Sequence, residues 1–189
     1  MHGRFPLSAG REGHRVVTQW LSAKTTHHGD PNELQVFDYI YAVLHCPAYR
    51  ETYAEFLRID FPRIPYPASP QEFWNLSAQG AQLRKLHLMD PASVGATPYP
   101  LQGEGDNIVH NPNFECGKIW INKTQGFDAV PDAAWDFFIG GYQPAQRWLK
   151  DRRGRALSFD EVKHFQRIIK VLAETARIMI SMEMTLKHG

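Results

Sequence analysis

The sequence is poor in the residues that build metal centres, disulfide frameworks and membrane spans. Only two cysteines occur among its 189 residues, Cys46 and Cys116, and neither belongs to a CxxC pair. Two isolated thiols exclude a disulfide framework and a zinc ribbon, and they are typical of a reducing cytosol. No apolar run reaches the roughly 20 residues that a membrane-spanning helix needs, and no secretory hydrophobic region lies near the amino terminus. We therefore expect a cytoplasmic protein that does not enter a membrane.

A large net charge and the common catalytic signatures are missing as well. Lys and Arg number 21 and Asp and Glu number 20, so the formal charge is only +1. A polyanionic partner would therefore have to meet a local patch of charge. The chain contains no GxSxG elbow, no phosphate-binding P-loop and no glycine-rich dinucleotide turn after a strand. Nine histidines occur, but no quartet of ligands has the spacing of a metal site. We expect neither catalytic nor metal-binding residues in this chain.

Apolar residues recur at helical spacing after a lead, residues 1–30, that shows little pattern. Their spacing of three and four positions predicts a helix with one buried stripe in residues 31–45. That stripe would consist of Leu34, Phe37, Tyr41 and Leu44. A second helix follows, and the prolines of "DFPRIPYPASP" then exclude further helix. We expect Phe61 and Ile64 of this extended stretch to pack into the core.

Two capping boxes mark the starts of two longer helices. Ser69 and Glu72 form the first box, which predicts a helix to about residue 89. Ser158 and Glu161 form the second box, which predicts a helix that runs nearly to the carboxyl end. Between the two helices, "NIVH" and "GKIWINK" alternate enough to predict two strands that pair across the turn "NPNFECG".

These elements together predict an α+β fold. It would be a mostly helical domain with a small antiparallel β insert and a long C-terminal helix. We expect a single domain over residues 31–189, with residues 1–30 as a poorly patterned lead. Within this domain, Gly140 and Gly141 are expected to adopt positive φ before a short helix that starts at Pro144.

The densest positive charge in the sequence lies in "GGYQPAQRWLKDRRGR", residues 140–155. Five cations accompany two aromatic residues there: Arg147, Lys150, Arg152, Arg153 and Arg155. Clustered arginines suit bidentate contacts to phosphate and guanine, so the segment is a candidate nucleic-acid surface. The alternative is a solvated helix end, because cations are favoured near any helix C-terminus. An ion pair between Arg147 and Asp151, four positions apart, would reduce the exposed charge.

The motif "NPNF", residues 111–114, is similar to the Asn/Asp-Pro-Pro-Tyr/Phe loop of N6-adenine methyltransferases, which grips a flipped adenine. Asn113 replaces the second proline of that loop. No upstream strand with a glycine-rich turn is present to hold S-adenosylmethionine. We therefore interpret the motif as a hairpin turn rather than a catalytic loop.

Four longer stretches resemble one family. "FDYIYAVLHCPAYRETYAEFLRIDFPRIPYP" resembles the region after the methyltransferase core in single-chain restriction–modification enzymes, the type ISP proteins and related type IIG N6-adenine DNA methylases. "AWDFFIGGYQPAQRWLKDRRGRALSFDEVKHFQRIIKVLAETARIM" is similar to the closing segment of the same region. "FWNLSAQGAQLRKLHLMD" and "GKIWINKTQGFDAVPDAAW" lie between them in the same order. The resemblance covers residues 33–179, and residues 1–30 match nothing that we can name.

This resemblance implies a role in DNA recognition. In those enzymes the carboxyl-terminal region is the target-recognition, or specificity, domain, which docks on duplex DNA and selects the sequence. The methyltransferase and nuclease or translocase domains of the same polypeptide lie upstream and carry out the chemistry. Because none of their motifs occurs here, we expect a fragment or a truncated product of such an enzyme. S-adenosylmethionine is expected only in the methyltransferase domain, with no cofactor in this chain.

Under this interpretation the cations of the basic segment anchor phosphates. The Gln143 side chain is a candidate reader of adenine, because an amide can form two hydrogen bonds with that base. Two lysines on or beside the predicted strand would flank the same groove. The predicted DNA-binding set is Gln143, Arg147, Lys150, Arg152, Arg153, Arg155, Lys118 and Lys123. Two alternatives stay open: a protein-interaction module that braces the parent enzyme, and a small stand-alone enzyme that uses "HNPNFEC".

Overall fold

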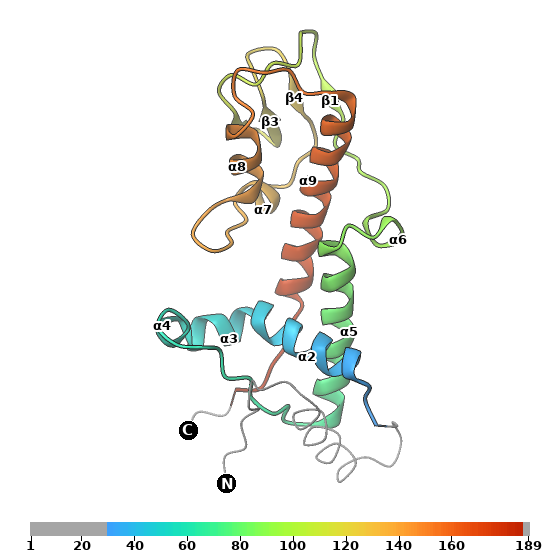
Figure 1. Ribbon diagram of the computed structural model, residues 1–189, viewed down its shortest axis with the longest axis vertical. Coiled ribbons are helices and arrows are strands. Elements are labelled where there is room, and N and C mark those ends of the chain that lie inside the picture. The colour runs from blue at the N-terminus through green and yellow to red at the C-terminus, as the bar shows by residue number, and fades with distance from the viewer. Residues whose placement is uncertain (1–29, 187–189) are drawn as a thin grey trace. The chain divides into compact units, whose positions relative to one another are not determined.

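A computed structural model describes residues 30–186 (Figure 1). The chain divides into two compact units: unit 1 comprises Met1–Lys85 and Ile178–Gly189, and unit 2 comprises Leu86–Arg177. All but the last residue of the lead, residues 1–30, lie outside the described residues. The single domain over residues 31–189 stays a prediction. None of the helices in the described part is long and apolar enough to cross a bilayer.

The described part of unit 1 is helical. It contains α2 (Glu33–His45), α3 (Pro47–Thr52), α4 (Ala54–Leu57) and most of α5 (Pro70–His87). The predicted box at the start of α5 is present, since the Glu72 N–H donates to Ser69 Oγ at 3.2 Å. α2 crosses α5 in Figure 1, and Gly80 of α5 permits the close approach, because a Cβ there would overlap the Asp38 carbonyl group.

α2 buries a different face from the one predicted. Leu34 and Phe37 are 52% and 48% exposed. The buried residues of the helix are Val36, Asp38, Tyr39, Ala42 and Val43. The buried stripe includes a carboxylate, Asp38, which pairs with Arg84 of α5 at 2.6 Å. A charged residue inside the buried stripe made the opposite stripe look more apolar, so the predicted face was wrong.

The proline-rich stretch between α4 and α5 is extended, as predicted. Two hydrogen bonds from buried tyrosines hold its backbone: Tyr39 Oη donates to Pro65 O at 2.9 Å and Tyr49 Oη donates to Arg63 O at 3.1 Å. Ile64, between these two attachment points, is fully buried. Phe61 lies before the first attachment point and is exposed, so the prediction that it packs into the core was wrong.

Unit 2 combines a four-stranded antiparallel sheet with helices. Its elements are α6 (Pro91–Val94), β1 (Leu101–Gln102), β2 (Asn113–Glu115), β3 (Lys118–Trp120), β4 (Gly126–Phe127), α7 (Asp132–Trp135), α8 (Pro144–Lys150) and most of α9 (Phe159–Ile180). The strand order is β1-β4-β3-β2. Sheet, α8 and α9 share one core, to which Phe127, Leu149 and Phe165 contribute fully buried side chains. The α+β fold with a long C-terminal helix is therefore confirmed.

The pairing inside the β insert differs from the prediction. β2 pairs directly with β3. The centre of "NPNFECG", Asn113–Glu115, is therefore strand, and the turn is confined to Cys116 and Gly117, whose φ angles are +51° and +73°. Two positive φ angles are typical of a type I′ hairpin turn. "NIVH" instead bridges the segment after α8, with Val109 opposite Arg153. The predicted hairpin of "NIVH" with "GKIWINK" was wrong, because the sequence does not show which of two neighbouring extended segments a strand will pair with.

Candidate nucleic-acid interface

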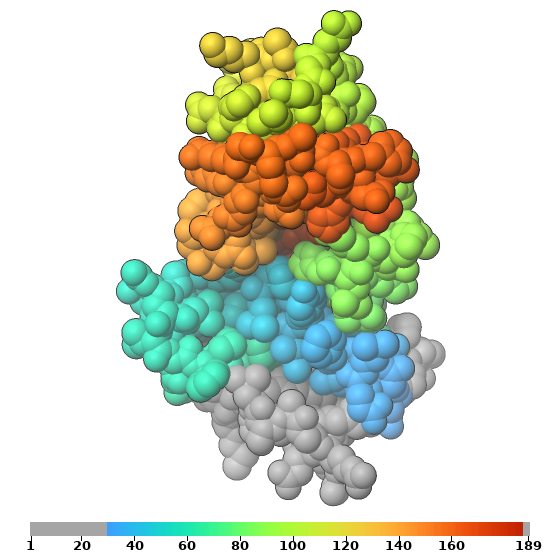
Figure 2. All heavy atoms as spheres, turned by 45° about the horizontal axis from the view of Figure 1, so that its top comes forward, coloured from blue at the N-terminus to red at the C-terminus, as the bar shows by residue number. Residues whose placement is uncertain are grey.

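The basic segment forms α8 and the turn that leaves it. α8 begins with Pro144 at its first position and ends at Lys150, and the exit turn passes through Gly154 at φ +80°. The exit turn is tied to the neighbouring extended segment, because the Gly154 N–H donates to Val109 O at 2.8 Å. The short helix and its exit turn are therefore as predicted. Figure 2 shows this segment and the start of α9, in orange, as one continuous surface band.

Two of the five cations are held by a single carboxylate, that of Glu161 in the first turn of α9. Arg155 binds it with both terminal nitrogens, at 2.6 Å and 3.1 Å, and Arg152 Nε donates to it at 3.2 Å. The Ser158 N–H also donates to Glu161, at 3.1 Å, and completes the predicted capping box. These hydrogen bonds, with that of Arg155 the largest cause, lower the pKa of Glu161 to about 2. We call Arg152 and Arg155 the anchored pair.

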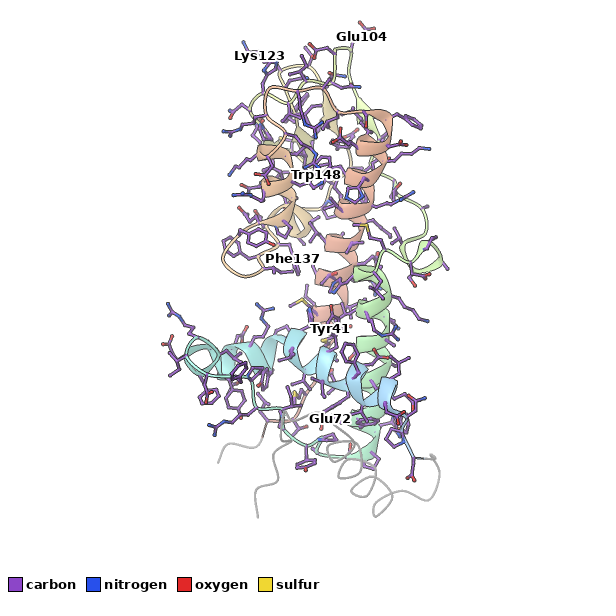
Figure 3. All side chains as sticks on the ribbon, viewed as in Figure 1. Tyr41, Glu72, Glu104, Lys123, Phe137 and Trp148 are labelled. Atoms are coloured by element: carbon purple, nitrogen blue, oxygen red, sulfur yellow. The ribbon has the colours of Figure 1, made fainter. Side chains whose placement is uncertain are left out.

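Arg152 also belongs to an aromatic stack that runs into the core. Its guanidinium carbon lies 3.6 Å from the centroid of the Trp148 ring, and its Nη1 donates to Trp148 O at 3.0 Å. Trp148 in turn stacks on Phe165 at 4.9 Å between ring centroids. The Arg152 side chain is only 24% exposed. Trp148, labelled in Figure 3, therefore serves packing and does not present its ring to a ligand.

The other three cations, Arg147, Lys150 and Arg153, are exposed and do not pair with Glu161, and we call them the exposed trio. Arg155 is also 52% exposed, but Glu161 holds its guanidinium. Arg147 forms the predicted pair with Asp151 at 3.0 Å. Because both side chains are at least half exposed, such a pair contributes only about 0.3–0.5 kcal/mol. Lys150 donates to the Gln146 amide at 3.3 Å. Arg153 forms no salt bridge with any residue in the range 30–186. These three side chains are free to meet an anion at little cost.

Gln143, the predicted adenine reader, has its amide engaged inside unit 2. Its Nε2 donates to Trp135 O at 3.4 Å, and its Oε1 accepts a hydrogen bond from Gln146 Nε2. A contact with a base would have to replace both bonds. In this structure the amide fixes the start of α8.

The sheet places the two predicted lysines toward opposite ends of β3. Lys118 begins the strand, and its Nζ lies 4.5 Å from the centroid of the Trp120 ring. Lys123 follows the strand in the loop to β4 and is exposed. This loop is braced against a second one, because Thr124 Oγ1 donates to Glu104 O at 2.9 Å. Figure 3 shows Lys123 and Glu104 at the same end of unit 2.

Backbone hydrogen bonds bring the Lys123 loop toward the basic segment. The His110 N–H donates to Ile121 O at 2.9 Å, and the preceding Val109 bridges Arg153. The loop and the exit turn are therefore separated by one extended segment, a distance of roughly 10 Å at the usual spacing between strands. The structure thus brings Lys123 near the exit turn and leaves Lys118 further away.

A turn between α7 and α8 carries exposed apolar residues that the sequence analysis did not single out. Phe138, Ile139 and Tyr142 are 57%, 37% and 51% exposed. The run "FFIGGY" was an available signal, because three large apolar side chains beside a Gly-Gly turn cannot all enter one core. Among residues 30–186, no group of histidine, cysteine or acidic residues is placed to hold a metal ion.

The family model described as the type ISP C-terminal specificity domain matches residues 6–181. The chain belongs to this family. The match starts at residue 6, so most of residues 1–30, which the sequence analysis left unmatched, lie inside the family region. No curated protein sequence matches the chain.

Three solved structures are similar to the chain, and each contains DNA or a DNA mimic. The DrdV–DNA complex is 24% identical with a TM-score of 0.73, over 93% of this chain and 20% of that one. A nuclease-deletion mutant of the type ISP enzyme LlaGI, with a DNA substrate mimic, is 19% identical with a TM-score of 0.62. The match covers 85% of this chain and 17% of that one. The ATP-dependent type ISP enzyme LlaBIII, bound to DNA, is 17% identical with a TM-score of 0.64. The match covers 89% of this chain and 12% of that one. At these identities the likeness shows the fold, and the chain spans a fifth or less of each relative.

Proposed function

We propose that this chain is the DNA-recognition part of a restriction–modification enzyme, which holds duplex DNA and selects a short target sequence. One observation carries the proposal: a specificity-domain fold presents the exposed trio on one short helix and its exit turn. The presence of DNA or its mimic in each of the three structures described above supports the same function.

In the proposed mode of binding, the exposed trio and Lys123 neutralise backbone phosphates. Each neutralised phosphate releases condensed counterions, so binding weakens as salt rises. The anchored pair has a different task, which is to tie the exit turn to the first turn of α9 through Glu161. Side chains on the neighbouring loops would then read base edges, because phosphate contacts set the register but carry no sequence information.

Methylation and cleavage would belong to other domains of a longer polypeptide in the cytoplasm. The methyltransferase domain would hold S-adenosylmethionine, and a nuclease or translocase domain would act on the same duplex. The present chain would supply the position on the DNA at which a target adenine is offered to the methyltransferase.

A salt titration of DNA binding tests this proposal. Fluorescence anisotropy of the full chain with a short random-sequence duplex would be recorded over a range of salt concentrations. The double variant Lys150→Ala/Arg153→Ala is expected to lose on the order of tenfold in affinity at low salt. Its slope of log affinity against log salt is expected to fall by about two, one for each lost phosphate contact.

The matched control is Arg58→Ala/Lys85→Ala, which removes two exposed cations from unit 1. This control is expected to bind as the wild type does. Equal losses in the two double variants would contradict the placement of the interface. Failure of the wild type to bind any duplex at low salt would contradict the function itself.

A further inference from the structure

We propose that the apolar turn, residues 138–142, is a wedge that inserts between neighbouring base pairs of bound DNA. This inference rests on the proposed function and adds a second kind of contact to it. The exposed trio would hold the phosphates, and the apolar turn would separate one base step. The apolar turn combines a hydrogen-bonded tip, exposed apolar side chains and a direct connection to the cationic helix.

Two backbone hydrogen bonds close the tip of the apolar turn. The Ile139 N–H donates to Tyr142 O at 3.0 Å, and the Tyr142 N–H donates to Ile139 O at 3.1 Å. Gly140 and Gly141 between them have φ angles of +55° and +89°, as a type I′ turn requires. An added Cβ would meet no crowding at either glycine, so the backbone conformation is what demands glycine. The tip is therefore closed by its own backbone, without support from other elements.

The base of the apolar turn is fixed to the core on both sides. On the side of α7, Phe137 packs against the core cluster of unit 2 (Figure 3). On the side of α8, Gln143 donates to Trp135 O at 3.4 Å and the helix begins at once with Pro144. A wedge needs such a base, because the force that unstacks two bases must be resisted by the fold.

The side chains at the tip are of the kind that separates stacked bases. Phe138, Ile139 and Tyr142 project large apolar groups, and Phe and Ile are among the residues that kink duplexes by partial insertion. Elsewhere in unit 2 the exposed ring of Phe159 is covered by Lys163, whose Nζ lies 4.2 Å from its centroid. No such cation or ring contact covers Phe138 within the described part of the chain.

Charge points to DNA as the occupant. The apolar turn runs straight into α8, which begins at Pro144, and Gln143 before it is extended. At up to about 3.3 Å per extended residue and 1.5 Å per helical residue, Arg147 and Lys150 lie up to roughly 11 and 16 Å along the chain from Tyr142. These distances correspond to about three to five nucleotides of one DNA strand, since successive phosphates advance by roughly 3.4 Å along the axis. A polyanion that binds these two cations would therefore meet the apolar turn with its base stack. A purely apolar protein partner would offer no counter-charge to Lys150 and would leave Arg147 with Asp151 alone.

An abasic duplex provides a direct probe of a wedge. Removing one base abolishes the stacking that a wedge must overcome, so a protein that inserts side chains binds the abasic duplex more tightly. We would compare a short intact duplex with the same duplex carrying one central abasic site, at one low salt concentration. The wild-type chain is expected to prefer the abasic duplex by on the order of tenfold.

The variant Phe138→Ala/Ile139→Ala is expected to lose this preference. It should keep its affinity for the intact duplex within about a factor of two and should keep the wild-type salt slope, because the cations are unchanged. The matched control is Phe159→Ala, which removes another exposed aromatic ring of unit 2 and is expected to retain the preference. Near-ultraviolet circular dichroism would check that each variant is folded.

The outcomes separate this inference from the proposed function. A wild type that binds both duplexes equally, with a normal salt slope, would overturn the wedge and leave DNA recognition standing. The wedge would also be overturned if the double variant kept the preference, or if it lost affinity for both duplexes to the same extent. Absence of all duplex binding at low salt would instead reject the proposed function, and the wedge with it.

Discussion

The anchored pair and the exposed trio come from one run of nine residues, yet they have different environments. Arg152 and Arg153 are neighbours in the chain. The first stacks on Trp148 and binds Glu161, whereas the second is exposed to solvent. The five cations of this run therefore differ in what they offer a partner, because Arg152 is only 24% exposed and Arg155, though 52% exposed, is paired with Glu161. The charge available to a partner is set by the carboxylates that the fold brings to the same place.

Glu161 is the residue that creates this difference. As the last member of a capping box it must point back toward Ser158, at the start of α9. The exit turn of α8 lies beside the start of α9. The Glu161 carboxylate that caps α9 therefore also binds Arg152 and Arg155 of the exit turn. Two tasks in one side chain make it the most informative residue to change.

Replacing Glu161 with alanine should have the largest effect on stability. The variant loses a cap, worth about 1 kcal/mol, the charge-assisted bond from the part-buried Arg152, worth about 1.5 kcal/mol, and the exposed pair with Arg155. We therefore expect the free energy of unfolding to fall by about 2–4 kcal/mol, measured by urea denaturation. The folded variant should also bind random duplex several-fold more tightly, because both arginines of the anchored pair are released.

Asp160→Ala is the control for this change, since Asp160 lies in the same helical turn and is exposed. Its loss should cost less than about 1 kcal/mol, the usual contribution of an acidic residue near a helix N-terminus. Equal destabilisation by the two variants would show that Glu161 acts only through the helix dipole.

Single substitutions of the neighbouring arginines should have opposite consequences. Arg152→Ala removes a cation–π contact and a packed stem, so we expect a loss of about 1–2 kcal/mol in the free energy of unfolding. Its DNA affinity should stay near that of the wild type.

Arg153→Ala should change stability by less than about 0.5 kcal/mol and lower DNA affinity by a factor of about five. Thermal melts measure the stability of both variants, and anisotropy titrations measure their DNA affinity. A stability loss in Arg153→Ala with an affinity loss in Arg152→Ala would contradict the distinction between the two groups.

Strong acid should weaken the anchored pair, because it protonates the Glu161 carboxylate that holds both arginines. The pKa of Glu161 is about 2 in the folded chain against an ordinary value of 4.5. A depressed carboxyl pKa stabilises the fold fully above the ordinary value, and that contribution is lost as the pH falls toward the folded value. Between pH 4.5 and 2 the wild type should therefore lose stability more steeply than Glu161→Gln. Urea midpoints at a series of pH values measure this, and parallel curves for the two proteins would count against the assignment.

The smallest effect is expected from Asp151→Asn, which frees Arg147. The exposed pair contributes little, so the free energy of unfolding should change by less than about 0.5 kcal/mol. One more unpaired cation in the exposed trio should raise affinity for random duplex by about twofold. A lower affinity in an anisotropy titration would mean that Asp151 helps to hold Arg147 in a productive position.

Local signals in the sequence predicted local structure well. Ser69 and Ser158 marked the starts of α5 and α9 correctly, because a cap is formed by residues three positions apart. The positive φ angles of Gly140 and Gly141 were predicted for a similar reason, as two adjacent glycines indicate a tight turn. The pairing of Arg147 with Asp151 also followed from helical spacing alone.

Partners that lie on another element of the fold could not be predicted. Asp38 is buried on α2 only because Arg84 reaches it from α5, 46 positions away. Arg152 and Arg155 were assigned to DNA because nothing local shows that the exit turn meets Glu161. The direction of the Gln143 amide likewise depends on the Trp135 carbonyl group of another element. Side-chain availability is a property of the fold, and a pattern of residue types does not contain it.

The two tyrosines that bind the proline-rich stretch have a consequence for how unit 1 can diverge. Both phenols donate hydrogen bonds to main-chain oxygens, which every amino acid supplies. The two hydrogen bonds therefore do not depend on which side chains the accepting residues carry. Substitutions at the exposed positions of this stretch should therefore accumulate freely, so long as both tyrosines are retained.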